Sequence, residues 1–506
     1  MATYSKITKV GFIWSVISRS LGELIGIPTA MVLARLLTPY DFGVAAAAGF
    51  FVQLSQRLTN FGFNQALVQH KDLREEHKSV VFIVNGVIGV LAWLVLMACA
   101  PLFSSMFRSR DAAAVIPMAG LSIAIGAVGG VPAALLVRDL KFKEVGLLDS
   151  AAAWMTAAVS VLLAWLGWGY WSLIYSQIFS ISIITVLRFR VARWWPRFLW
   201  SRAALMQLLS FGVGLHFKRL LESVAQNCDN LVVGNFLGLT ALGYYDKAFS
   251  TMQRAVTLLN AGGPAVSLRV LAIIQDDDLR FRAAYRKLIL TATLMAYPAI
   301  GYLILVAPHL ILFLFGPQWI SAVLPFQVLC AAGLLKVLNM YVSTAAQSKG
   351  QVWGEVWRQL LYVALIVIGT AIGSRFGLPG AAVGVLAATL VVTVLMHEWL
   401  ARITGLTVRE LLLPQVPAWL CAGLVGLMVL AARFAVRWIP AHGVTNGLLL
   451  GAETVAALLT YAAFIRFAPF VELRTVVDDT IEEFSPWVRS LLRMRPAKGV
   501  GAITSK

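Results

Sequence analysis

Basic side chains interrupt the long apolar runs of this chain, and their positions allow only a few kinds of chemistry. Arg19 and Arg57 lie near the middle of two apolar runs, at about 10–36 and 42–68. A charge at the centre of a bilayer costs about 2.5–3.5 kcal/mol on insertion scales, so it normally faces a water-filled cavity or a partner. The hairpin of these two runs is therefore predicted to form one wall of a cationic cavity inside a membrane. The mid-run cations are Arg19, Arg57, Lys218, Arg219, Arg254 and Lys336.

Acidic side chains accompany only some of these cations. Glu23 follows Arg19 by four residues, and Glu222 follows Lys218 at the same spacing. Side chains at i and i+4 are neighbours on a helix, so both pairs can form ion pairs. The mid-run cations without an acid in their own helix are Arg57, Arg254 and Lys336.

The resulting surplus of positive charge predicts an anionic ligand. A guanidinium group grips phosphate oxygens in bidentate geometry, so two or three of them in one cavity would suit a pyrophosphate. The alternative is that acids on other helices balance all six cations, which then serve packing. Two further cations, Lys247 and Arg358, lie near the ends of their runs, where a long side chain can reach the headgroups.

Amide side chains in the same runs are candidates for sugar contacts. Gln53, Arg57, Asn60 and Asn64 follow each other at i, i+4, i+7 and i+11, which predicts one polar stripe on a single helix. Gln253 adds an amide next to Arg254. The alternative for each of these residues is a polar contact between helices.

Acids inside apolar runs are candidates for ion coupling, because such groups often relay protons or bind Na⁺. They are Glu23, Glu222, Asp229, Glu453 and the pair His397–Glu398, for which a solvated pair at the cytoplasmic end of its run is the favoured interpretation. Ion pairing or an interfacial position is the alternative for each. We therefore expect no cofactor and leave coupling to H⁺ or Na⁺ open.

The composition defines the class of protein. Of the 506 residues, 59% are apolar and only 13% are charged, and the mean hydropathy is +0.80. These values are typical of an all-α polytopic membrane protein. The four cysteines lie inside apolar runs without metal or disulfide spacing, and no nucleophile motif or glycine-rich phosphate loop is present. We therefore expect no metal site and no enzyme.

About fourteen transmembrane helices are predicted, because each apolar run is long enough to cross a bilayer. Those near 205–237 and 241–268 contain the most polar residues. The runs are 10–36, 42–68, 79–103, 112–137, 146–167, 169–188, 205–237, 241–268, 287–315, 321–347, 352–374, 378–401, 415–438 and 444–466. The longest connections are about 188–204 and 269–286.

The distribution of Lys and Arg predicts the orientation. Basic residues gather in the even-numbered turns and near both ends of the chain, which places both termini in the cytoplasm. The net charge of +18 then reflects topology and contact with anionic lipid headgroups, so we expect no nucleic acid. The few basic residues of the odd-numbered, outer turns are Arg35, Arg108, Arg110, Arg375, Arg433 and Arg437.

An internal repeat divides the chain. Residues 31–43 match residues 231–243 at an offset of 200, with Gly43 opposite Gly243, and the same offset pairs Arg19 with Arg219. Six spans per unit make the halves parallel repeats, an architecture typical of transporters with a site between the halves. Chance similarity of apolar segments is the alternative. The predicted units are an N-terminal lobe (1–203), a C-terminal lobe (204–403), helices 13–14 (404–466) and a cytoplasmic tail with an interfacial amphipathic helix (467–506).

Several motifs, in order from about residue 7 to 400, resemble those of one family. They are ARLLTPYDFG (34–43), NFGFNQALVQHKDLREEH (60–77), LSFG (209–212), DNLVVGNFLG (229–238), LGYYDKA (242–248), LFGPQW (314–319) and PFQVL (325–329). In these stretches the chain resembles Wzx-type oligosaccharide and polysaccharide flippases. They form the polysaccharide-transport family of the multidrug/oligosaccharidyl-lipid/polysaccharide superfamily.

The resemblance implies a function as well as a fold. It implies two six-helix bundles that give alternating access and flip an undecaprenyl-pyrophosphate-linked oligosaccharide across the bacterial inner membrane. This activity would serve the assembly of exopolysaccharide, capsule or lipopolysaccharide. In relatives that flip the peptidoglycan precursor, cavity arginines lie on spans 1, 2 and 8, where this chain has Arg19, Arg57 and Arg254. Helices 13–14 resemble a pair that, in some relatives, flanks a groove for the lipid tail.

Two other functions remain as alternatives. A multidrug or small-solute exporter of the same superfamily would favour acidic or aromatic cavities for cationic drugs, whereas the surplus here is basic. A scaffold for polysaccharide assembly would tolerate changes in the cavity. Polysaccharide polymerase or assembly proteins are expected as partners of a flippase.

Overall fold

A computed structural model describes residues 22, 25–59, 62–70, 72–209, 213–260, 263–437 and 446–467. All regular secondary structure in these ranges is helical. The predictions for Arg19, Glu23, Asn60 and the tail after residue 467 lie outside the described residues. The same holds for the side chains of Lys218, Arg219 and Glu222, whose backbone lies in a described helix.

The first part of the chain forms a group of helices that we call the first helix group. It begins with the helix Ile25–Leu36. The helices that follow are α2 (Pro39–Thr59), α3 (Phe63–Gln69), α4 (Glu75–Ala98), α5 (Ala100–Phe107), α6 (Arg110–Val128), α7 (Gly130–Arg138), α8 (Phe142–Trp165) and α9 (Trp171–Ala192).

A short helix, α10 (Arg202–Leu209), leads to the second helix group. This group contains α11 (Val213–Leu237), α12 (Leu239–Leu259), α13 (Gly263–Ile273), α14 (Asp278–Phe315), η1 (Pro317–Ala322), α15 (Val323–Ser348), α16 (Val352–Ser374) and α17 (Gly377–Thr404). The remaining elements are α18 (Val408–Leu412), η2 (Leu413–Gln415), α19 (Val416–Arg437) and α20 (Asn446–Phe467).

Ten helical stretches in the described part of the chain are long and apolar enough to cross a membrane. Helices α2, α11 and α12 are not among them, because polar side chains lower their hydropathy. The chain is thus a multi-pass helical membrane protein, and the prediction of fourteen spans is confirmed only in this coarser form. The predicted lobe boundaries and cytoplasmic termini stay predictions.

Two predicted elements differ from the structure. The run 42–68 is not one helix, because Gly62 takes a left-handed conformation (φ 79°) between α2 and α3, which ends the polar stripe of Gln53 and Arg57. The predicted connection 269–286 is mostly helical: α13 runs to Ile273. Helix α14 begins at Asp278, where the Asp277 carboxylate accepts a hydrogen bond from the Arg280 amide at 3.0 Å.

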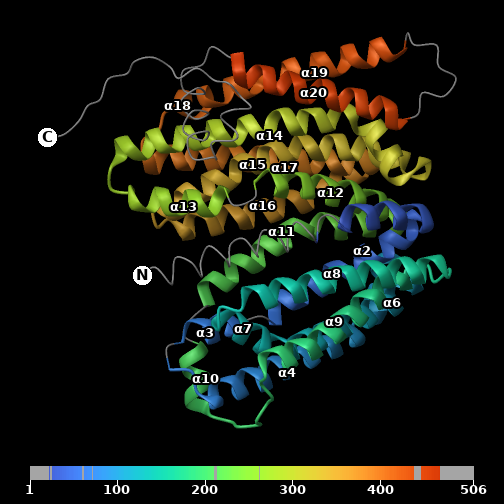
Figure 1. Cartoon of the computed structure of the whole chain (residues 1–506), viewed down its shortest axis with the longest axis vertical. Helices are drawn as coiled ribbons and strands as arrows, with labels where there is room; N and C mark the ends of the chain where they lie inside the picture. The colour runs from blue at the N-terminus through green and yellow to red at the C-terminus, as the bar shows by residue number, and fades with distance from the viewer. Residues whose placement is uncertain are drawn as a thin grey trace.

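The two helix groups converge at one end of the molecule, on the right in Figure 1, where α2 and α12 begin. A Cβ atom on Gly43 would lie 1.7 Å from the Leu239 carbonyl oxygen, and one on Gly243 would lie 1.8 Å from that of Pro39. Only glycine allows two backbones to approach this closely. We call this region, with η1 and the α5–α6 turn, the closed end.

The glycine contact predicts opposite effects for two substitutions on the same helix. Gly43→Ala forces α2 away from α12 and should destabilise the protein by about 1–3 kcal/mol through overpacking. Gly49→Ala is the matched control, because no atom lies within 4 Å of a Cβ there. Alanine is the better helix former, so this variant should be neutral or slightly more stable. The thermal unfolding midpoints of the two purified variants test this, and equal midpoints would contradict the contact.

Candidate functional site

Arg57 and Arg254 lie on the helix faces by which the two groups meet. Arg57 follows Gly43 by about four helical turns, and Arg254 follows Gly243 by about three, so each shares the face of its glycine. Both side chains are exposed in the structure. Neither forms a hydrogen bond or an ion pair with another described residue. Within the described ranges, the facing sides of α2 and α12 therefore carry two arginines without an ion pair beyond the closed end.

No described neighbour of Arg57 or Arg254 forms an ion pair with either side chain. The Nη1 atom of Arg254 lies 3.8 Å from the Cβ position of Gly26, so this side chain of the second helix group reaches the first helix of the other group. Asp246, two turns earlier on α12, interacts electrostatically with Arg254 without forming an ion pair. Arg57 stands in the last turn of α2, where the helix dipole favours a cation.

The three described amides of the predicted sugar site have different surroundings. Gln53 is exposed on α2, and Gln253 is half-buried on α12. Asn64 lies on α3 and accepts a hydrogen bond from the Asn85 side chain of α4 at 3.2 Å. Asn64 thus makes a polar contact between helices, while Gln53 remains beside the exposed arginine of its helix.

Lys247 does not reach the headgroups, and the prediction that it snorkels is wrong. Its side chain is only 6% exposed. The ammonium group lies 4.1 Å from the ring centroid of Phe42, 4.6 Å from that of Phe315 and 5.5 Å from that of Trp319. These cation–π contacts hold the charge inside the closed end. The rings come from α2, α14 and η1, which the sequence does not place together.

Hydrogen bonds from η1 bind the second helix group to the first. The Gln318 side chain donates to the carbonyl oxygens of Ala34 at 2.5 Å and Leu37 at 3.2 Å. The Trp319 indole, which is fully buried, donates to the Ala34 carbonyl at 2.8 Å. In the sequence this segment stands out only as a family motif, because its carbonyl partners lie 281 to 285 positions away.

Two further hydrogen bonds cross the closed end. Arg35 donates from Nη2 to the Phe313 carbonyl at 2.9 Å, and Asn235 donates from its side chain to the Met106 carbonyl at 2.8 Å. All of these donors use backbone carbonyls at helix ends, which have no partner within their own helix. The closed end is thus a polar seam as well as a glycine contact.

A buried polar cluster surrounds Asp229 within the second helix group. Its side chain is 2% exposed and accepts hydrogen bonds from the Tyr245 hydroxyl at 2.7 Å and the Asn230 amide at 3.1 Å. Lys336 interacts electrostatically with Asp229 and lies 4.5 Å from the ring centroid of Phe249. The structure therefore brings Lys336 to an acid on another helix. Among the described atoms, the side-chain oxygen of Asn230 has no hydrogen-bond partner.

Glu453, a candidate for ion coupling, is engaged in a second buried cluster. It is fully buried, with the Arg433 Nε atom at 2.7 Å and the His309 Nδ1 atom at 3.1 Å from its carboxylate oxygens. Arg433 also donates to the Leu305 carbonyl at 2.8 Å. These contacts hold α19 and α20 against α14. Glu453 therefore forms an ion pair, as the alternative to ion coupling predicted.

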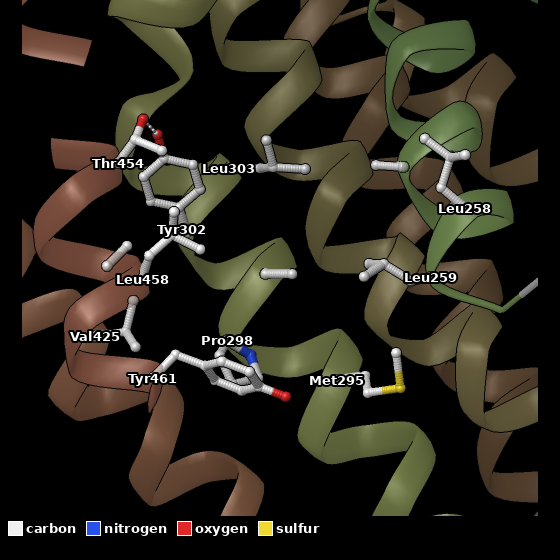
Figure 2. A pocket seen from close by; sticks show the side chains of 13 residues that line it. Leu258, Leu259, Met295, Pro298, Tyr302, Leu303, Val425, Thr454, Leu458 and Tyr461 are labelled. Carbon is white, nitrogen blue, oxygen red and sulfur yellow. Dashed lines mark hydrogen bonds between the residues drawn. The ribbon is translucent and has the colours of Figure 1, made fainter. Parts of the chain in front are cut away.

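An apolar cavity of about 430 Å³ opens between α12, α14, α19 and α20 (Figure 2). Two polar side chains in its wall, Tyr302 and Thr454, hydrogen-bond to each other at 2.6 Å. Ala255, which follows Arg254, also lines the cavity. The other lining residues are Leu258, Leu259, Met295, Pro298, Ala299, Leu303, Val425, Ala457, Leu458 and Tyr461.

In its described residues the chain is a multi-pass helical membrane protein with exposed arginines on α2 and α12. A family model described as polysaccharide biosynthesis protein matches residues 32–324. The chain belongs to this family.

Curated relatives match between 61% and 69% of this chain. The chain is 28% identical over 314 residues to the succinoglycan biosynthesis transport protein ExoT of Rhizobium meliloti, covering 61% of this chain and 63% of that protein. It is 23% identical over 345 residues to the lipopolysaccharide biosynthesis protein WzxC of Escherichia coli, covering 67% of this chain and 69% of that protein. It is 22% identical over 353 residues to the teichuronic acid biosynthesis protein TuaB of Bacillus subtilis, covering 69% and 73%.

Solved structures share the fold. The lipid II flippase MurJ in an inward closed conformation superposes with a TM-score of 0.70 at 13% identity, covering 90% of this chain and 97% of that one. An inward-facing multidrug resistance transporter of the MATE family, from the MOP superfamily, superposes with a TM-score of 0.60 at 16% identity, covering 76% and 94%.

The Glu453 cluster predicts a loss of stability that an ion-coupling acid would not show. Glu453→Gln leaves Arg433 without a charge partner in a buried site, which should cost about 3 kcal/mol and lower the unfolding midpoint. Glu398→Gln is the matched control, because its ion pair with Arg402 is exposed and should contribute less than about 1 kcal/mol. A Glu453 variant with normal stability but altered dependence of transport on an ion gradient would instead indicate coupling.

Proposed function

We propose that this protein is a flippase that moves a polyprenyl-pyrophosphate-linked oligosaccharide across the bacterial inner membrane. The observation that carries the proposal is the pair of exposed guanidinium groups, Arg57 and Arg254, on the meeting faces of α2 and α12, which form no ion pair with any residue that the structure describes. Uncompensated cations at membrane depth call for water and an anion. Membership in the polysaccharide biosynthesis protein family supports a glycan as the cargo.

The chemistry of the cargo fits the two kinds of surface near Arg254. A diphosphate offers oxygens in the geometry that guanidinium forks bind, so Arg57 and Arg254 would hold it from opposite helix groups. Gln53 and Gln253 would offer hydrogen bonds to the first sugars. The polyprenyl chain is an apolar ligand, and the cavity between α12, α14, α19 and α20 is an apolar site of suitable character. Arg19, Lys218 and Arg219 remain candidates to assist.

Transport would proceed by alternating access of the cargo site to the two membrane faces. The closed end carries Arg35, Arg108 and Arg110, which belong to the sparsely basic loops, so we assign it to the outer side of the membrane. In this assignment the contact between α2 and α12 would close the site toward the outer side. Opening to the outside would separate Gly43 from Gly243 and break the hydrogen bonds of Gln318 and Trp319.

A multidrug or small-solute exporter is the second candidate, because the fold is shared with a multidrug resistance transporter. A site for cationic drugs would be expected to present acids or aromatic rings to its ligand. The exposed charges on α2 and α12 are instead arginines. The flippase function is therefore favoured, and drug sensitivity of a deletion strain separates the two.

The cationic site predicts which arginines are essential. Arg57→Glu and Arg254→Glu should each abolish polymer export, because a carboxylate repels the diphosphate. Arg375→Glu is the control: this arginine is also exposed but lies between α16 and α17, away from α2 and α12, and export should stay near the wild-type level. Leaflet-resolved measurement of lipid-linked oligosaccharide in a complemented deletion strain tests this. Normal export with Arg57→Glu, at equal membrane abundance, would refute the phosphate site.

We further propose that the Asp229 cluster couples transport to an H⁺ or Na⁺ gradient. Asp229 and the unpartnered Asn230 oxygen are oxygen ligands of the kind that Na⁺ and protons use. Asp246 lies on the same cluster, since it accepts a hydrogen bond from the Asn230 side chain at 3.3 Å. Glu23 and Glu222 remain candidates from the sequence.

Coupling through Asp229 predicts a specific loss. In proteoliposomes, Asp229→Asn should retain slow, gradient-independent exchange of lipid-linked oligosaccharide. The acceleration of this exchange by an imposed H⁺ or Na⁺ gradient should be at least tenfold smaller than in the wild type. Asp149→Asn is the control, because Asp149 forms an exposed ion pair with Arg188 and should keep the acceleration. If Asp229→Asn responds to both gradients like the wild type, this carboxylate does not couple transport.

A further inference from the structure

A second cationic surface, separate from the Arg57 and Arg254 faces, forms a polar cleft at the closed end. Its volume is about 550 Å³, and both helix groups supply its walls. The first group contributes Tyr40 and the α5–α6 turn from Phe107 to Asp111. The second contributes 235–239, where α11 ends and α12 begins.

Two guanidinium groups in this cleft have no partner. Arg108 and Arg110 are exposed, and neither forms a hydrogen bond or ion pair within the described ranges. Asp111 is the one acid among the lining residues. Its carboxylate accepts a hydrogen bond from the Tyr40 hydroxyl at 2.6 Å and lies in the first turn of α6. The cleft thus carries a net positive charge.

The wall formed by α12 adds unused hydrogen-bond donors, in contrast to the matching helix of the other group. At the start of α2, the Thr38 amide and hydroxyl donate to the Asp41 carboxylate at 2.8 and 2.6 Å. The offset of 200 places Gly238 and Ala241 at the equivalent positions of α12. Helix α12 accordingly begins without a side-chain cap and without an acid in its first turn.

The first amides of α12 have no acceptor as a result. No described group accepts a hydrogen bond from the backbone N–H of Leu239, Thr240 or Ala241. Unsatisfied N–H groups at a helix N-terminus and nearby arginines both favour a phosphate or similar anion. Of these two helix starts, the one of α12 thus leaves its first amides without an acceptor in the described part of the chain.

We propose that the cleft binds a phosphate or diphosphate group and that this ligand stabilises the closed end. The arginines belong to the first helix group and the free amides to the second, so a bound anion would bridge the groups. A ligand that binds one arrangement better shifts the population toward it. Phosphate at this face would therefore hold the transporter in the outer-closed arrangement, as a brake on the step that opens it outward. Binding at the cleft does not depend on the phosphate role of Arg57 and Arg254, whereas the effect on outward opening rests on the proposed function.

Inorganic pyrophosphate is a direct probe of the cleft on the purified full-length protein. We expect it to raise the unfolding midpoint with saturation, and to bind at least tenfold more weakly to the double variant Arg108→Gln/Arg110→Gln. Arg375→Gln removes one exposed arginine elsewhere and should titrate like the wild type. The double variant Arg57→Gln/Arg254→Gln should still bind pyrophosphate at the cleft, because it retains Arg108 and Arg110. If the Arg108/Arg110 double variant titrates like the wild type, the site is refuted.

Bridging of the two helix groups has its own test. Gly43→Ala, which retains both arginines but separates α2 from α12, should weaken pyrophosphate binding severalfold, whereas Gly49→Ala should not. Unchanged binding to Gly43→Ala would overturn the bridging role.

The source of the phosphate is distinguished with nanodiscs of phosphatidylcholine with or without phosphatidic acid. Stabilisation by phosphatidic acid that is lost in the Arg108→Gln/Arg110→Gln variant assigns the cleft to a lipid headgroup. Stabilisation by pyrophosphate alone assigns it to a free anion. Stabilisation by neither overturns the proposal.

Discussion

The close approach of two helix backbones at Gly43 and Gly243 is the constraint on which the rest of the structure depends. Each glycine lies against a carbonyl of the opposite helix group, at a distance that no side chain permits. The contact pins the starts of α2 and α12 together, and it allows η1 to reach the carbonyls of Ala34 and Leu37. Because α2 and α12 are held together at this end, Arg57 and Arg254, several turns further along, lie on the faces of these helices that carry the two glycines.

The treatment of positive charge differs along the molecule, and this difference indicates where a ligand belongs. Arg433 is satisfied by Glu453, Lys247 by three aromatic rings, and Lys336 by the nearby Asp229. Arg57 and Arg254 have no such partner in the described part of the chain. This contrast supports the proposal of an anionic cargo at the two exposed arginines.

Helices α2 and α12 meet at the closed end but differ in the chemistry of their first turns. Helices α2 and α12 have the same length and begin 200 residues apart, yet only α2 carries a cap from Thr38 and Asp41. Such asymmetry is expected if the two halves perform different tasks in one cycle. It also explains why a ligand could act at the closed end without entering the cargo site.

Several features could be predicted from the sequence because they depend on local chemistry. Long apolar runs need helices to satisfy their backbone in a membrane, so the all-helical class followed directly. The Gly43–Gly243 offset was also visible, whereas Arg57, predicted at the middle of a run, lies in the last turn of α2. The helix break before α3 could not be predicted, because a single glycine in an apolar run does not indicate that Gly62 takes a left-handed conformation.

Only the tertiary structure decided which charges are free, because the partners lie far apart in the chain. Glu453 meets His309 across 144 positions, and no local spacing signals that pair. Lys247 was expected to reach water, but its neighbours come from three separate elements. Hydropathy and helical periodicity are properties of neighbouring residues, and they determined the class of the protein. Charge compensation is a property of packed surfaces, and it decided where an anion can bind.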